Sequence, residues 1–255
     1  MNVYLRTRMC SACIIAMASA ALMLGIAFSR AEPVVFQTAV TRVGLLELFT
    51  SEGCSSCPPA EKWLSALKDS PNLWNEFVPV AFHVDYWDYL GWKDPWASSQ
   101  FTARQHAYVS SWRADSVYTP GFVLNGNEWR DWSNSKGPSP SKAKAGVLKV
   151  SSQDLTHWNV TFTPAIPSTG EYEVHAALLA NSLTSDVKAG ENRGRHLNHD
   201  FVATNLTSNP LKANADKLEG QFTITQGQAS RRALAVWLTR KGTLEPLQAV
   251  GGWLP

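Results

Sequence analysis

Apolar residues in the first half of the chain gather in short runs that alternate with stretches of helical spacing. The run at 43–49 has the length and apolar content of a buried strand, and the stretch after it places Trp63, Leu64 and Leu67 on one helical face. In order, the pattern predicts a strand at 43–49, a helix at 60–68, a strand at 78–85, a helix at about 96–112 and a strand at 121–124.

After residue 124 the sequence pattern changes from alternating strands and helices to turns and strand-like segments. Asn125 and Gly126 form the strongest short-range signal for a hairpin turn, so residues 128–132 are expected to return antiparallel. Residues 133–144, rich in Ser, Pro, Gly and Lys, are interpreted as a linker. Beyond it, strand-like segments occupy 146–152, 158–163, 172–179, 221–225 and 233–239. These predict a small, mostly antiparallel, sandwich-like β domain.

The N-terminus carries the pattern of an export signal. Arg6 and Arg8 precede an uncharged run over 9–29, and Ser29 and Ala31 supply small residues for cleavage. We therefore interpret 1–31 as a signal peptide, 32–144 as the first domain and 145–255 as the second. The alternative is a retained anchor, since the uncharged run is long enough to span a bilayer. We expect a periplasmic or secreted protein.

Composition and charge exclude several partners. The 255 residues are 44% hydrophobic and 17% charged, an ordinary globular mixture. Removing the predicted signal takes away three arginines and changes the net charge from +2 to −1. A nearly neutral chain gives no reason to expect nucleic acid as a partner, or a membrane after signal cleavage.

Cysteine spacing points to the chemistry. Cys10 and Cys13 lie in the predicted signal, which leaves Cys54 and Cys57 as the only cysteines of the mature chain. A disulfide that closes a two-residue loop adds little stability, because it removes little entropy from the unfolded chain. The pair is therefore better suited to redox exchange or to metal binding.

The surroundings of the pair favour a reactive thiolate. It lies at the start of a predicted helix, whose free N–H groups stabilise negative charge on the first cysteine. No Lys, Arg or His occurs between Thr50 and Glu61, so we expect only a moderate lowering of the pKa. Glu47 is the candidate buried carboxylate for proton transfer, the alternative being that it points to solvent.

The order of elements and the motifs resemble the thioredoxin superfamily. The pair lies between a strand and a helix, and Thr119-Pro120 opens another strand about 60 residues downstream. The resemblance implies that Cys54 is the exposed nucleophile and that Cys57 resolves the mixed disulfide. It also implies that Pro120 is cis beside the pair and that Thr119 presents substrate. We accordingly expect an α/β thioredoxin-like domain followed by the smaller β domain.

A narrower resemblance covers most of the mature chain. The segment 46–60, together with 83–87 and 118–120, resembles the secreted thioredoxin-like family known as domain of unknown function 1223. The likeness extends to 190–195 in the β-rich part. It implies the fold and export, and supplies no established activity.

Three functions remain open at this point. The first is an exported thiol-disulfide oxidoreductase without a cofactor, acting on a protein or small-molecule thiol or disulfide with an unknown electron donor. The second is a copper or zinc protein in which Cys54, Cys57 and His83 form an S₂N ligand set. The third is a non-catalytic binding module on a thioredoxin-like scaffold.

The polar segment 191–200 and the tryptophans can each be interpreted in more than one way. The polar segment 191–200 is interpreted as a structural loop, a partner contact, or a metal site of His196, His199 and Asp200, in that order. Arg193 within it could pair with Glu47 or Asp85. The eleven tryptophans suit core packing or an aromatic groove for a peptide or glycan.

Overall fold

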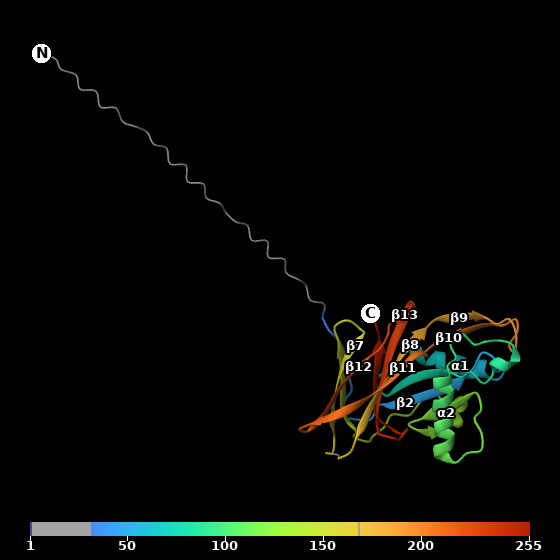
Figure 1. The fold of residues 1–255 in the computed structure, drawn as a ribbon, viewed down its shortest axis with the longest axis horizontal. Helices are drawn as coiled ribbons and strands as arrows, with labels where there is room; N and C mark the ends of the chain where they lie inside the picture. Colours follow the sequence, from blue (N-terminus) through green and yellow to red (C-terminus); the bar gives the residue numbers. More distant parts are fainter. Residues whose placement is uncertain (2–31, 168) are drawn as a thin grey trace. The chain divides into compact units, whose positions relative to one another are not determined.

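The computed structural model describes residue 1, residues 32–167 and residues 169–255 (Figure 1). Residues Glu32–Pro255 form one compact unit. Beyond Met1, the predicted signal peptide, with Cys10 and Cys13, lies outside the described residues. No helix within the described ranges is long and apolar enough to cross a membrane.

The elements of the first half follow the predicted order. They are β1 (Val34–Gln37), β2 (Gly44–Thr50), α1 (Cys57–Ala66), β3 (Phe77–His83), α2 (Ser99–Trp112), β4 (Gly121–Leu124) and β5 (Asn127–Glu128), with short 3₁₀ helices η1 (Leu67–Asp69), η2 (Asp88–Leu90) and η3 (Asp131–Asn134). Strand β4 turns at Asn125 and Gly126 into β5, which confirms the predicted turn, but the returning strand ends at Glu128 and does not extend to residue 132.

The second half consists of strands. They are β6 (Gly146–Ser152), β7 (His157–Pro164), β8 (Tyr172–Asn181), β9 (Leu183–Asp186), β10 (His196–His199), β11 (Val202–Asn214), β12 (Lys217–Thr223), β13 (Arg231–Arg240) and β14 (Pro246–Trp253). The five predicted strands correspond to β6, β7, β8, β12 and β13. Strands β1, β9, β10, β11 and β14 were not predicted.

One mixed sheet runs through both halves of the chain. Strand β2 pairs in parallel with β3 and antiparallel with β4. The other edge of β3 meets β11, with Val202 opposite Ala81. Strand β11 also pairs with β8, and the sheet continues through β13 to β14. At its far end β11 pairs with β12, which leads through β7 and β6 to β1.

The expected fold class, an α/β thioredoxin-like domain followed by a smaller sandwich-like β domain, is wrong. The protein is mostly β, with a 12-stranded mixed sheet and two α-helices among its described residues. The physical reason lies at β3, which is buried along its whole length and therefore needs hydrogen-bonding partners at both edges. Strand β11, from the part of the chain assigned to a separate domain, supplies the second partner.

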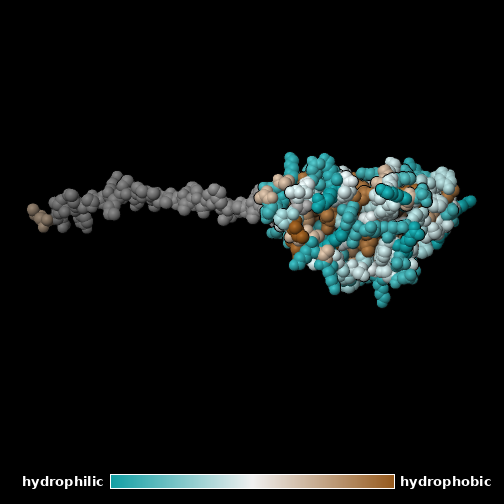
Figure 2. Space-filling view, turned by 90° about the horizontal axis from the view of Figure 1, so that it is seen from below, coloured by the Kyte–Doolittle hydropathy of each residue, from teal (hydrophilic) through white to brown (hydrophobic). Residues whose placement is uncertain are grey.

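Alternation along β13 places a core on each face of this sheet. Ala233, Ala235 and Trp237 pack in one apolar cluster with β2, β3 and α1. Leu234 and Val236, between them in sequence, pack in a second cluster with β6, β7 and β12. Successive side chains of a strand point to opposite faces, so a strand buried on both sides joins the two cores. On the face in Figure 2 the surface is mainly hydrophilic, with small apolar patches.

Candidate functional site

The two cysteines lie where β2 gives way to α1. Strand β2 ends at Thr50 and the helix begins at Cys57, with prolines in its first turn, where a missing N–H leaves no hydrogen bond unmade. The connecting loop turns tightly, and Cys57 N donates to Cys54 O at 3.2 Å. Both cysteines are free thiols and both are buried, so the expectation that Cys54 is exposed is wrong: its side chain is covered by the segment around Thr119. A side chain at Gly53 would not fit, because its Cβ would lie 2.7 Å from Cβ of Trp87.

Hydrogen bonds favour a thiolate at Cys54. The largest effect is the hydrogen bond from the Cys57 thiol, and the Ser56 and Thr119 side chains add to it. Burial opposes these bonds, and the net result lowers the pKa of Cys54 to about 6. The sulfur lies 3.2 Å from Ser56 Oγ and 3.6 Å from the carbonyl oxygen of Thr119. The lowered pKa favours the thiolate form of Cys54 near neutral pH.

Cys57 has the opposite environment. Burial raises its pKa far above the usual value, and the hydrogen bond and negative charge of Cys54 raise it further. The side chains of Thr50 and Thr119 oppose this rise. The pair thus combines one thiolate with one protonated thiol.

Thr119 and Pro120 lie beside the pair, and the peptide bond between them is cis. Trp87 Nε1 donates to Thr119 Oγ1 at 2.8 Å, and the Thr119 side chain lowers the pKa of both cysteines. A pocket of about 340 Å³ adjoins this segment and is lined by Tyr118, Pro120, Phe122, Trp129, Arg130 and Trp132.

Glu47 is buried, but on the face of β2 that α2 covers. It accepts a hydrogen bond from Arg104 Nε at 2.6 Å and another from the Tyr108 hydroxyl. Thr50 is three residues further along the strand and therefore points to the opposite face, toward α1. The structure thus pairs Glu47 with Arg104 and does not bring it to the cysteines.

Glu61 is the carboxylate on the cysteines' side of the sheet. It follows Cys57 by four residues, so the two share one face of α1. Its Oε1 accepts a hydrogen bond from Thr50 Oγ1 at 2.6 Å, and Thr50 also lowers the pKa of Cys57. The (i, i+4) spacing from Cys57 was the sequence signal that would have found it.

A buried charged cluster surrounds Glu61. Its Oε2 accepts a hydrogen bond from His199 Nδ1, and the other ring nitrogen of His199 lies 3.0 Å from Glu52 Oε1. Burial alone would lower the pKa of His199, but the bonds and charges of the two carboxylates outweigh it and raise this pKa to about 10. Trp92 Nε1 completes the cluster by donating to Glu52 at 2.6 Å.

His83 belongs to this cluster as well. Its Nδ1 lies 2.8 Å from Asp94 Oδ2, and its ring centroid lies 5.1 Å from that of His199. The described His, Cys, Asp and Glu side chains include one group that could ligate a single ion, namely Glu61, His83 and His199. The two cysteines are not in that group, so the structure places His83 with a different set of ligands from the predicted S₂N set.

The polar segment 190–195 meets the cysteine loop. Asn192 Nδ2 donates to the carbonyl oxygens of Glu52 at 2.8 Å and of Cys54 at 2.9 Å. Glu191 Oε2 accepts from the backbone N–H of Ser55 at 2.9 Å, next to the N-terminus of α1. The β9–β10 connection therefore closes over the loop that carries Cys54.

Other residues of this segment have separate partners. His196 lies beside Asp186, and Asp200 pairs with Lys68. The set of His196, His199 and Asp200 is therefore split between three partner groups. The carboxylates suggested for Arg193 are also occupied, Glu47 by Arg104 and Asp85 by Thr102.

Tryptophans contribute to packing around the first core. Trp63 makes edge contacts with Phe122, Trp129 and Trp132, and Trp74 with Trp253. Trp129 and Trp132 pack in this core and also line the pocket beside Pro120.

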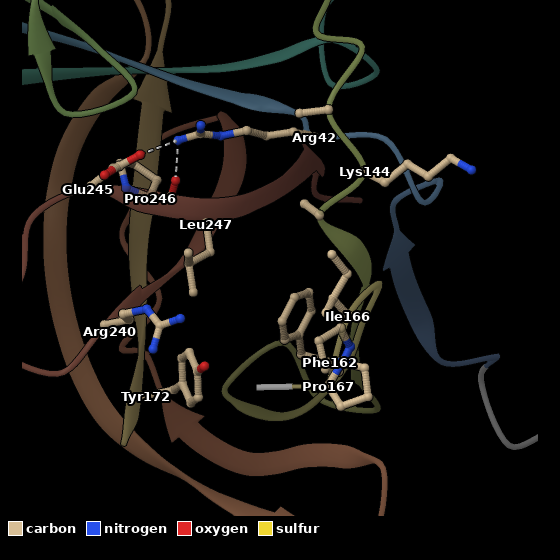
Figure 3. Close-up of a pocket in the computed structure, with 13 residues that line it drawn as sticks. Arg42, Lys144, Phe162, Ile166, Pro167, Tyr172, Arg240, Glu245, Pro246 and Leu247 are labelled. Atoms are coloured by element: carbon tan, nitrogen blue, oxygen red, sulfur yellow. Dashed lines mark hydrogen bonds and ion pairs between the residues drawn. The ribbon is translucent and has the colours of Figure 1, made fainter. Parts of the chain in front are cut away.

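A second pocket, of about 470 Å³, lies away from the predicted site residues (Figure 3). It has an apolar side formed by Phe162 and Ile166, and Arg42 at its rim bonds to Glu245 and to the carbonyl of Pro246. It contains none of the thiol or histidine chemistry described above.

Comparison with known proteins places the chain in a family. The model of a protein of unknown function, DUF1223, matches residues 45–239. The chain belongs to the DUF1223 family. This confirms the resemblance to DUF1223 noted from residues 46–60, 83–87 and 118–120. No curated protein matches this DUF1223 chain.

Two solved structures resemble the DUF1223 protein in fold. A crystal structure of a protein from Agrobacterium tumefaciens is 24% identical, with a TM-score of 0.60, over 85% of this chain and 96% of that one. HBP35 of Porphyromonas gingivalis is 12% identical, with a TM-score of 0.57, over 85% of this chain and 76% of that one. At sequence identities this low, the similarity to the two structures concerns the fold alone.

Proposed function

We propose that this protein is an exported thiol-disulfide oxidoreductase in which Cys54 attacks and Cys57 resolves. The difference between the two thiols carries the proposal: the pKa of Cys54 is lowered to about 6, while burial holds Cys57 protonated. Only a thiolate attacks a disulfide, so this difference assigns the first step to Cys54.

The reaction proceeds in two exchanges. The Cys54 thiolate attacks one sulfur of a substrate disulfide, forming a mixed disulfide and releasing the other substrate sulfur as a thiolate. Cys57 then loses its proton and attacks Cys54, which forms the Cys54–Cys57 disulfide and releases the second substrate thiol. The substrate gains two electrons and the pair loses two. Two donor thiols return them by becoming a disulfide, and an oxidised pair acting on a dithiol runs the same steps in reverse.

The proton of Cys57 needs an acceptor in the second step. We assign this role to Glu61, reached through the Thr50 hydroxyl, because Thr50 interacts with both Cys57 and Glu61. Burial would raise the pKa of Glu61, but the hydrogen bond and charge of His199 hold it below its usual value. Glu61 is therefore an ionised acceptor inside the protein.

The substrate approaches from the side of the exposed Ser55 and Ser56. Cys54 itself is 1% exposed, so a substrate disulfide must enter between this loop and the segment around Thr119. The aromatic pocket beside Pro120 suits an apolar side chain of a polypeptide, which favours protein disulfides as substrates.

Insulin reduction by residues 32–255 tests the function. With dithiothreitol as electron donor, we expect the protein to accelerate the reaction, Cys54→Ser to abolish the acceleration, and Cys57→Ser to accumulate mixed disulfide. Ser110→Ala, at an exposed position on α2 outside the cysteine loop and the pocket beside Pro120, is the matched control and should retain the rate. An unchanged rate in Cys54→Ser, or a pair that does not cycle in a glutathione redox buffer, would refute the proposal.

A further inference from the structure

Three side chains from three different elements meet in the buried cluster beneath the cysteine loop. Glu61 comes from α1, His83 from the end of β3 and His199 from the end of β10. His83 is 0% exposed and His199 is 1% exposed. Each of the three offers one ligand atom, and these atoms lie within 4.8 Å of one another. Two imidazoles and a carboxylate form a donor set that zinc uses in proteins.

Each histidine has a carboxylate beside one of its ring nitrogens. Asp94 Oδ2 lies 2.8 Å from His83 Nδ1, and Glu52 Oε1 lies 3.0 Å from His199 Nε2. This is the usual arrangement of metal-binding histidines, in which an outer carboxylate fixes the ring and makes its free nitrogen a better ligand.

The nitrogens that remain are those available for coordination. His83 Nε2 is buried and has no hydrogen-bond partner among the described residues. His199 Nδ1 faces Glu61 directly. A buried nitrogen without a partner is uncommon, since such an atom gives up its hydrogen bond to water without replacement. A ligand at this position would satisfy it.

We propose that Glu61, His83 and His199 bind one divalent transition-metal ion of the zinc class. The ion coordinates His83 Nε2 and takes the place of the proton between His199 Nδ1 and Glu61. In a tetrahedral site with bonds of about 2.0–2.1 Å, ligand atoms are about 3.3 Å apart, so the widest separation closes by at most about 1.5 Å. Glu61 Oε1 keeps its hydrogen bond to Thr50.

The surrounding charge suits a dication. Glu52, Glu61 and Asp94 place three carboxylates in a space that water barely reaches. A metal ion among neutral imidazoles balances two of these charges and joins α1, β3 and β10 below the nucleophile. The site is separate from the cysteines, so the inference does not depend on thiol exchange.

Cobalt and zinc binding to residues 32–255 tests the proposal. The protein is the Cys54→Ser/Cys57→Ser double variant, which removes thiolate ligands from the experiment. After incubation with Zn²⁺ and gel filtration, we expect one zinc per chain by elemental analysis. With Co²⁺ we expect the visible absorption of a nitrogen- and oxygen-ligated ion, without a thiolate charge-transfer band.

Single variants locate the site. His83→Gln in the same background should lose the bound metal, and Asp94→Asn should weaken binding about 10- to 100-fold. His157→Gln is the matched control, since His157 lies 2.7 Å from Asp154 in a similar pair that is exposed. The His157→Gln variant should keep one bound zinc ion per chain.

Two results would overturn the inference. One is a folded double-cysteine variant that retains no zinc or cobalt, a result that does not depend on any substitution in the cluster. The other is metal that binds only when Cys54 and Cys57 are present, which would instead indicate a thiolate site. Loss of thiol exchange would leave the proposed metal site standing.

Discussion

The side chain of Asn192 and the backbone of Cys54 are joined by a hydrogen bond of 2.9 Å across 138 residues of sequence. The same amide donates to the carbonyl of Glu52, and Arg195 fixes its orientation by donating to Asn192 Oδ1 at 2.9 Å. Because Asn192 is fully buried, it holds the carbonyl groups on both sides of Gly53 in place. The β9–β10 connection is thus part of the thiol site.

Asn192→Ala should loosen the cysteine loop. It leaves two carbonyl groups without their donor, and an unsatisfied buried polar group costs about 1–3 kcal/mol. We expect a lower free energy of unfolding by about that amount in urea, together with slower insulin reduction. Asn214→Ala is the control, because its amide bonds to Glu219 on an exposed hairpin. Equal losses in both variants would contradict the role of Asn192.

Alkylation of Cys54 should follow a titration near pH 6. The lowered pKa means that the thiolate, and with it the alkylation rate, increases as pH rises through about 6 and then levels off. The hydrogen bond from Cys57 is the largest cause of the lowering, so Cys57→Ala should move the midpoint upward, toward 9.0. Iodoacetamide kinetics across pH 4–10 measure both midpoints, and an unchanged midpoint in Cys57→Ala would refute this cause.

The stability of the reduced protein should depend on pH in the same range. The pKa of Cys54 is lower in the folded protein than its usual value of 9.0. Cys54 therefore contributes a stability that rises with pH between about 6 and 9, whereas His199, whose pKa is raised to about 10, contributes a stability that falls as pH rises over much of the same range. Urea denaturation of the reduced protein and of Cys54→Ser at several pH values isolates the Cys54 contribution: the free energy of unfolding of the reduced protein relative to that of the variant should rise between about pH 6 and 9.

The sequence correctly predicted the strand and the helix on either side of the cysteines, but it did not predict all strands of the surrounding sheet. Cys54 and Cys57 lie between an apolar strand and a proline-started helix, and each of these signals is local. Strand β11, which pairs with β3, β8 and β12, is exposed over much of its length. Its sequence is therefore polar and lacks the apolar pattern from which a strand is predicted. Long-range pairing of that kind leaves no periodic signal in a single sequence.

The selection of Glu47 as the proton-transferring carboxylate was also limited by the lack of tertiary information in the sequence. Glu47 was proposed because it precedes the cysteines in a buried strand, and it is buried, but on the side where Arg104 reaches it. The face that Glu47 occupies depends on which helix covers which side of the sheet, a tertiary property. Glu61 shares a helix face with Cys57, a relationship that spacing alone expresses.

Glu61→Gln should slow the second exchange without slowing the first. The amide cannot accept the proton of Cys57, so mixed disulfide with Cys54 should accumulate by about 10-fold or more in quenched-flow samples. The measurement is made in a chelator, so that bound metal does not contribute. Glu47→Gln is the matched control: it should lower stability by about 3–5 kcal/mol by leaving buried Arg104 unpaired, without accumulation. Accumulation in both variants would mean that the effect is structural.

The pocket beside Pro120 should distinguish large substrates from small ones. Trp132 lines it, and a protein substrate that places an apolar side chain there gains contact area that a small disulfide does not. Trp132→Ala should therefore lower kcat/KM for insulin about 10-fold and leave the rate with oxidised glutathione unchanged. Tyr89→Ala removes an aromatic side chain that is 78% exposed and outside the pocket, so it should change neither rate. If Trp132→Ala slowed both substrates equally, the pocket would act on the fold of the Thr119–Pro120 segment rather than on substrate binding.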